Sequence, residues 1–357
     1  MVISKQDKQI LRELAKKYME LASLPVNKEK TEMWKHINML KDEKPMVWIN
    51  QVPWHEMDVN GELTIRTSNE FCRSLETFLR QQIYQFEHMR CDMVLEPVLQ
   101  CPLVIEDTGF GITEDVDIVN TDINNSVVSR HFKIQIRDEE DLEKIKYPVV
   151  TYDEKATEEN YSTMLDIFQD IIPVEKSGMR GFWFAPWDEL VRWWGIQEVF
   201  IDMYDRPELV NKAMARFVDA WLRRLEQYEK LNLLDLNNIN EPVGSGAYGY
   251  TDELPGRDNK PEVVRPSHLW GSAAAQIFSD VSPRMHEEFA LSHEIRWLER
   301  FGLTYYGCCE PLHRKIHILE KIPNLRKISM SRWINVDEAV SQIGRKYVFS
   351  YKPNPAV

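Results

Sequence analysis

Short apolar runs that alternate with helical stretches constrain the fold of this chain more than any other feature. Seven runs of four or five residues predict strands, at 46–50, 92–96, 181–185, 233–237, 303–306, 327–331 and 347–351. Strands that alternate with helices along a chain are typical of βα units, whose strands assemble into a parallel sheet. The sequence therefore predicts an α/β fold built on such a sheet.

The helical stretches carry their own start signals. Between 205 and 228 apolar residues recur every three or four positions behind an Asp-Arg-Pro-Glu opening, which predicts one helix with one buried face. Ser282 and Pro283 have the character of a helix cap and a first-turn proline. Residues 1–44 are expected to form N-terminal helices.

Two segments interrupt the βα rhythm. Residues 113–137 predict a β-hairpin insertion, with turn residues at 122–126 between two alternating strands. Residues 238–272 lack periodicity and predict a long active-site loop that covers the cleft and orders when ligand binds. Because no interdomain linker or repeat is found, residues 1–357 are expected to form a single domain.

Composition excludes several classes of protein. With 43% hydrophobic residues the chain can bury a large core, and its net charge of -13 repels phosphate backbones, so nucleic acid is not an expected partner. No run approaches the ~18 apolar residues of a membrane span, so no membrane partner is expected. Five cysteines do not make a disulfide framework, which indicates a reducing compartment and a cytoplasmic protein.

Polar and aromatic residues follow several of the predicted strands. In a barrel of parallel strands, the reacting groups project from the carboxyl ends of the strands and from the loops that follow them. The catalytic candidates selected by this rule are Asn50, His55, Glu96 and Tyr306, and the substrate-binding candidates are Gln51, Trp54, Trp187, Asn237, Glu241 and Asn354. Among these, Trp187 is placed to wall a flat aromatic ligand.

Residues 303–311, LTYYGCCEP, end a predicted strand in side chains that can bind metal. If the pleat persists, Tyr306, Cys308 and Glu310 share one side and Cys309 lies on the other. Cys308 and Glu310 are therefore the expected ligands of a Zn²⁺ ion, with a histidine from elsewhere as the third. The alternative is that both cysteines are small buried hydrophobic residues.

Five stretches resemble the uroporphyrinogen decarboxylase superfamily. They are 44–51 (KPMVWINQ), 91–96 (CDMVLE), 181–187 (GFWFAPW), 328–333 (ISMSRW) and 348–355 (VFSYKPNP), in the family's order over nearly the whole chain. The resemblance implies a distorted (β/α)8 TIM barrel with a deep cleft. With seven predicted strands the eighth βα unit is lacking, so the chain is truncated, or the N-terminal segment or a neighbouring chain in a homodimer closes the barrel.

The departures from the family pattern bear on function. The decarboxylases carry arginines just after the first strand to hold substrate carboxylates, whereas residues 50–55 contain none. The family's zinc methyltransferases carry a His-x-Cys ligand pair on the fifth strand, and Tyr306-Gly-Cys308 keeps only the cysteine. The resemblance therefore favours a zinc-dependent methyltransferase that acts on a small methyl donor and transfers a methyl group to or from a corrinoid carrier on a partner protein.

Two other functions stay open. One is a metal-free lyase, similar to uroporphyrinogen decarboxylase, that acts on a tetrapyrrole or another carboxylated substrate with Glu96 as general acid. The other is a non-catalytic barrel that binds a tetrapyrrole or an aromatic ligand. Metal content distinguishes the methyltransferase from both.

Overall fold

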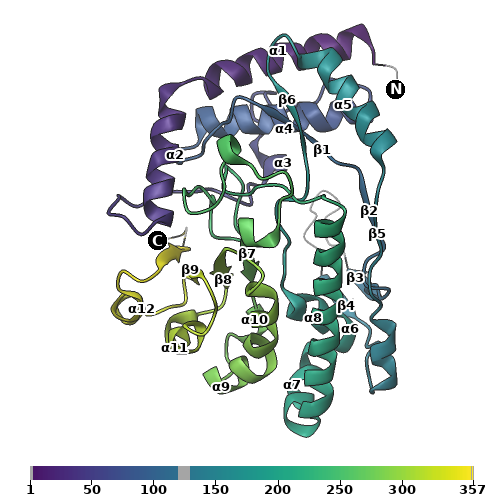
Figure 1. Ribbon diagram of the computed structural model, residues 1–357, viewed down its shortest axis with the longest axis vertical. Helices are drawn as coiled ribbons and strands as arrows, with labels where there is room; N and C mark the ends of the chain where they lie inside the picture. The colour runs from purple at the N-terminus through teal and green to yellow at the C-terminus, as the bar shows by residue number, and fades with distance from the viewer. Residues whose placement is uncertain (1–2, 120–128, 355, 357) are drawn as a thin grey trace.

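The computed structural model describes residues 3–119, 129–354 and 356, and it is a mixed α/β fold (Figure 1). Its strands are β1 (Leu99–Pro102), β2 (Ile105–Asp107), β3 (Val116–Val119), β4 (Ser129–Phe132), β5 (Val150–Tyr152), β6 (Val174–Ser177), β7 (Trp270–Ala273), β8 (Leu303–Tyr306), β9 (Leu325–Met330) and β10 (Val348–Tyr351). Its longer helices are α1 (Lys5–Ala22), α2 (Pro25–Asn38), α4 (Glu70–His88), α5 (Glu154–Phe168), α6 (Pro186–Trp194), α7 (Ile196–Asp205), α8 (Pro207–Lys230) and α12 (Val336–Ile343). Shorter helices are α3 (Trp54–Met57), α9 (Pro283–His286), α10 (Ser292–Leu298) and α11 (Ile316–Leu319).

A parallel sheet forms the centre of the molecule. Its strand order is β10-β9-β8-β7, and each pair of neighbours runs parallel. Helices α9 and α10 connect β7 to β8, α11 connects β8 to β9, and α12 connects β9 to β10. This alternation confirms the predicted α/β class, and three of the predicted strands correspond to β8, β9 and β10.

Strand β7 lies inside the segment that was expected to be a loop, so the predicted loop 238–272 is wrong at its end. The sequence Trp-Gly-Ser-Ala has neither alternation nor branched side chains, and it gives no strand signal. Tertiary packing accounts for the strand, because the ring of Phe301 covers Gly271 so closely that a Cβ there would lie 2.3 Å from its Cδ2 atom.

The four earlier predicted strands are extended segments and not regular strands. Met179 and Leu234 form only an isolated parallel bridge. Further along, the Asn237 side chain makes the hydrogen bonds to β7 that the backbone of a neighbouring strand would otherwise make. Its Oδ1 accepts from Trp270 N at 2.9 Å, and its Nδ2 donates to Trp270 O at 2.9 Å. An apolar run predicts burial, but it does not predict whether side chains or backbone supply the hydrogen bonds.

Three small two-stranded sheets are separate from the four-stranded one. β1 and β6 pair in parallel, and β2 and β5 pair antiparallel. β3 and β4 pair antiparallel inside the segment 113–137, where the hairpin was expected. The predicted turn residues 122–126 lie outside the described residues.

The predicted helix starts are confirmed at two positions. Helix α8 begins at Pro207 and buries the apolar stripe that the spacing indicated. Helix α9 begins at Pro283, and the Ser282 hydroxyl accepts from Met285 N at 3.2 Å as a cap. Nowhere in the described part of the chain is a helix both long and apolar enough to cross a membrane.

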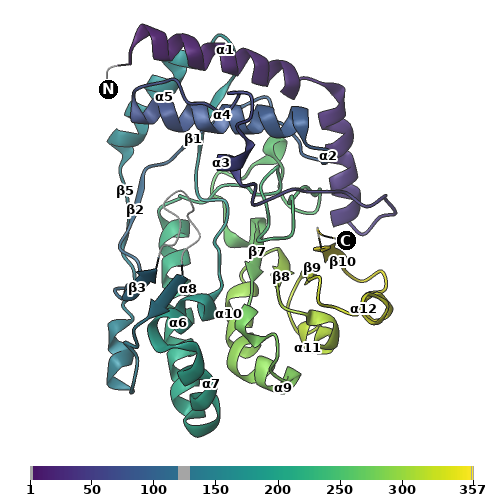
Figure 2. The ribbon, with the colours of Figure 1, turned by 180° about the vertical axis from the view of Figure 1, so that it is seen from behind.

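The N-terminal helices form a second layer at one end of the molecule. α1 and α4 lie side by side in both views, with α5 next to them (Figures 1 and 2). Their core includes Tyr248 and Tyr250 from the long segment before β7. Tyr248 and Tyr250 therefore place this part of the segment against the N-terminal helices.

Close packing of glycine against Tyr305 makes this segment sensitive to small changes. A Cβ on Gly246 would lie 2.6 Å from the Tyr305 ring, which is itself buried. We expect Gly246→Ala to lower the free energy of unfolding by about 1–3 kcal/mol, the usual cost of overpacking, in urea denaturation. Gly256→Ala is the control, because the nearest atom to its Cβ is a side-chain oxygen at 3.4 Å. Equal stability of the two variants would contradict this packing.

Candidate functional site

Two cavities flank the extended segments 179–183 and 234–241. The larger, called here the basic cavity, has a volume of about 510 Å³. It is lined by Tyr161, Val174, Glu175, Lys176, Arg180, Asp235, Leu236, Ile239, Arg257 and Lys260. Four of these side chains are basic and two are acidic. Lys176 and Arg257 pair with Glu158 and Glu96, which leaves Arg180 and Lys260 as the cations available to attract an anion.

Arg180 and Lys260 share one carboxylate in the basic cavity. Arg180 Nη2 donates to Asp235 Oδ2 at 3.2 Å and to Gln100 Oε1 at 2.9 Å, while Lys260 Nζ donates to Asp235 Oδ1 at 2.6 Å. Arg180 Nε is buried and has no hydrogen-bond partner among the described residues. Two cations on one carboxylate leave an excess positive charge, and the free N–H is an unused donor.

Glu96, a predicted catalytic residue, lies next to this cavity. Its Oε1 accepts from Tyr250 OH at 2.9 Å and from Asn240 N at 3.3 Å, and its Oε2 pairs with the guanidinium of Arg257. Glu96 is therefore joined to the basic cavity through Arg257. Its oxygens already have partners, so it positions Arg257 and Tyr250.

The smaller cavity, called here the aromatic cavity, has a volume of about 190 Å³. It is lined by Gly181, Phe182, Trp183, Asn237, Glu241, Pro242, Val243, Gly244, Trp270, Gly271, Ser272, Trp297 and Phe301. Two predicted substrate-binding residues, Asn237 and Glu241, are thus brought together on its wall. Burial raises the pKa of Glu241, Arg180 opposes that shift, and the charge of Glu96 adds to it.

The residues expected after the first strand lie elsewhere. Asn50, Gln51 and His55 are exposed, Trp54 packs edge-on against Tyr84 of α4, and none of the four lines either cavity. The predicted strand 46–50 is followed by Gln51, whose φ is 57°, and then by the short helix α3. This turn carries the chain toward α4. Asn354 also lies outside both cavities and accepts from Ala356 N at 3.1 Å.

Trp187 and Tyr306 are core residues, which corrects their predicted site roles. Trp187 is fully buried on α6, where its Nε1 donates to Phe289 O at 3.1 Å, so it does not wall a ligand. Tyr306 is also fully buried, and its hydroxyl lies 2.6 Å from His286 Nε2 and 2.7 Å from Glu294 Oε2. Both side chains pack against helices that cover the sheet, away from the two cavities.

A consistent chain of donors runs through this buried network. Lys315 Nζ lies 3.2 Å from His286 Nδ1, so that nitrogen accepts, Nε2–H donates to Tyr306, and Tyr306 donates to Glu294. Burial lowers the pKa of His286 to about 3, with the charge of Lys315 adding to the shift. Burial raises the pKa of Glu294 to about 8, so its carboxyl is held protonated near neutral pH.

The predicted metal ligands do not fit a three-ligand zinc site. Glu310 does turn back toward Cys308, but its Oε2 accepts from Cys308 N at 2.8 Å and its Oε1 from Ala275 N at 3.3 Å. Gly307, with a φ of 97°, breaks the pleat on which the ligand prediction rested. Cys308 Sγ instead lies 3.5 Å from Cys309 Sγ.

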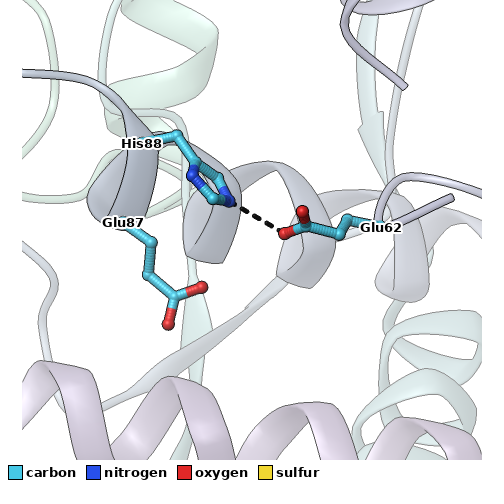
Figure 3. Close-up of side chains that lie close together, drawn as sticks. All are labelled: Glu62, Glu87 and His88. Atoms are coloured by element: carbon cyan, nitrogen blue, oxygen red, sulfur yellow. Dashed lines mark hydrogen bonds and ion pairs between the residues drawn. The ribbon is translucent and has the colours of Figure 1, made fainter. Parts of the chain in front are cut away.

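One group of three metal-capable side chains is found among the described residues, and it is remote from these cysteines. Glu62, Glu87 and His88 lie together on and beside α4, with His88 Nε2 2.9 Å from Glu62 Oε2 (Figure 3). The group is largely exposed, and Glu87 already pairs with Lys17 at 2.7 Å. Such a surface group is an ordinary set of ion pairs and does not supply the missing zinc ligand.

Sequence reasoning missed the cations of the basic cavity. Arg180, Arg257 and Lys260 share no spacing or motif, and only the folded chain brings them to one cavity, where Arg180 and Lys260 pair with Asp235 and Arg257 pairs with Glu96. A weak signal existed, since Arg180 precedes a predicted strand and Asp235 lies within another. Comparison with protein-family models, with curated proteins and with solved structures finds no match for this chain.

The raised pKa of Glu294 makes stability depend on pH. Below its unfolded value of 4.5 the carboxyl is protonated in both states; above it only the unfolded state loses the proton, until the folded pKa of about 8 is reached. The contribution of Glu294 to the free energy of unfolding is therefore complete below pH 4.5. It decreases as the pH rises toward about 8, by at most about 1.4 kcal/mol per pH unit. We expect Glu294→Gln to flatten this fall in urea denaturation between pH 5 and 8.

The matched control is Glu288→Gln, an exposed position on the preceding π-helical turn, Glu287–Leu291. It should keep the wild-type slope. A wild-type slope in Glu294→Gln would show that Glu294 is ionised in the folded protein.

Proposed function

We propose that this chain is a barrel enzyme similar to the uroporphyrinogen decarboxylase superfamily that acts without metal on a small carboxylated substrate. For the fold, the parallel sheet supplies four strands, and the extended segments 46–50, 92–96, 179–184 and 233–237 precede them in chain order. Strand β7 thus completes a set of eight extended segments, the number of a (β/α)8 barrel.

The basic cavity is the observation that carries the functional proposal. Carboxylates are held best by charge-assisted hydrogen bonds from guanidinium and ammonium groups. Arg180, Arg257 and Lys260 supply such groups from segments away from the first strand, where arginines were sought and not found. Arg180 Nη2 already donates to Asp235 and Gln100, so the carboxylate of a ligand would add to or replace these contacts.

Glu241 is suited to supply the proton that a lyase needs. Burial raises the pKa of its carboxyl, which keeps the acid form available, and Arg180 is near enough to act on that pKa. In a decarboxylation, the electron pair of the bond to the carboxylate moves to the substrate carbon as CO₂ leaves. Proton transfer from Glu241 to that carbon gives the C–H product, and solvent restores the proton on Glu241.

The zinc-dependent methyltransferase that the resemblance favoured has less support. It requires a metal, and Cys308 and Glu310 do not fit a three-ligand zinc site because Glu310 is bound by backbone N–H groups. The metal-free lyase needs only groups that already line the two cavities. We therefore favour the lyase over the methyltransferase.

Succinate binding tests the basic cavity. We expect wild-type protein to bind succinate in isothermal titration calorimetry at low salt, and Arg180→Gln to weaken binding at least about tenfold, because hydrogen bonds to charged groups contribute about 1.5–3 kcal/mol. Lys260→Gln should weaken binding less, because its side chain is 46% exposed. Arg284→Gln, an exposed position on α9, is the matched control and should bind as wild type.

Two results would contradict the proposal. Absence of carboxylate binding to the wild type would remove its basis. Unchanged affinity in both Arg180→Gln and Lys260→Gln would place the anion site outside the basic cavity. Release of ¹³CO₂ from carboxyl-labelled acids that bind, lost in Glu241→Gln with binding retained, would then establish the lyase step.

A further inference from the structure

The aromatic cavity has the size of one ring. Its volume is about 190 Å³, and an apolar cavity of roughly 150 Å³ is known to hold benzene. A tetrapyrrole has four rings and does not fit such a space. The cavity therefore limits the apolar part of a ligand to a single ring.

The walls of this cavity match a flat apolar group. Five aromatic side chains line it, contributed by Phe182, Trp183, Trp270, Trp297 and Phe301. Aromatic rings pack against one another in offset or edge-to-face geometry with a gain beyond their buried area. Trp183 is 48% exposed and forms the solvent side of the lining, while Trp270 and Trp297 are buried. A planar ring can therefore enter past Trp183 and pack against buried aromatic faces.

Among the described residues that line this cavity, Glu241 carries the one charged side chain. Asn237 uses its amide to bind Arg180 O at 2.7 Å and both backbone groups of Trp270 at 2.9 Å. Glu241 makes no side-chain hydrogen bond within the described ranges 3–119, 129–354 and 356. Its carboxyl is thus the group that meets a polar substituent or the reacting carbon of a bound ring.

The aromatic and basic cavities adjoin along two segments. Arg180 and Leu236 line the basic cavity, and the next residues, Gly181 and Asn237, line the aromatic one. Glu241 lies on the aromatic wall, and its pKa responds to the charge of Arg180. Arg180 is therefore close enough to the ring pocket to act on Glu241.

We propose that the ligand is a monocyclic aromatic carboxylic acid, with its ring in the aromatic cavity and its carboxylate toward Arg180. This inference rests on the proposed function, which supplies the carboxylate site. It adds that the apolar part of the substrate is one aromatic ring, held beside Glu241.

Gly181 offers a direct test of the ring site. Gly181 is an exposed lining residue, a Cβ at this position meets no atom within 4 Å, and the backbone is not in the left-handed region, so a larger side chain can be added at this wall without strain. We expect wild-type protein to bind benzoate at least about tenfold more tightly than acetate in calorimetry. Gly181→Leu should remove most of this preference, Gly181→Ala only part, and neither should change acetate affinity or the melting temperature.

The outcomes separate this inference from the proposed function. If benzoate and acetate bind equally and Arg180→Gln weakens both, the carboxylate site stands and the ring site is wrong. If benzoate is preferred but Gly181→Leu keeps that preference, the ring binds elsewhere and the inference is also wrong. If neither acid binds, the proposed function itself fails. A 1-naphthoate affinity well above that of benzoate would contradict the one-ring limit.

Discussion

One backbone carbonyl, that of Tyr248, is shared by the parallel sheet and the N-terminal helices. Tyr248 O accepts from Lys327 Nζ of β9 at 2.7 Å and from Asn38 Nδ2 at the end of α2 at 3.0 Å. Lys327 is fully buried, and desolvation lowers its pKa to about 7. A buried ammonium without acceptors is costly, so the Lys327 side chain holds the Tyr248 carbonyl, and with it the segment before β7, in place. This segment in turn joins the sheet to the N-terminal helices.

The two cavities exist because the segments beside β7 are held by side-chain hydrogen bonds and not by a continuous strand ladder. Where a sheet has a continuous ladder, strands lie about 4.8 Å apart and leave no space between them. Between 179–183 and β7 the ladder is replaced by the Asn237 side chain and one isolated bridge, so side chains line open space there. The irregular backbone is therefore what makes room for a ligand.

The site combines charge and apolar surface in adjoining spaces. The two positive charges of Arg180 and Lys260 exceed the single negative charge of Asp235, which they share. The wall of the aromatic cavity is formed by tryptophan and phenylalanine rings. In a protein with an acidic surface, a local excess of positive charge guides anions to one place. Charge thus selects the carboxylate, and cavity size selects the group attached to it.

The sequence by itself determined the α/β class, the parallel strands β8 to β10, the starts of α8 and α9, and two cavity residues, Asn237 and Glu241. These follow from short-range patterns: apolar periodicity, proline and cap chemistry, and the position of polar residues after strands. Only the tertiary structure decided that β7 is a strand, that Gly307 turns Cys308 away from a metal geometry, and that Arg180, Arg257 and Lys260 meet at one cavity. Each of these depends on contacts between residues far apart in the chain, which no local pattern encodes.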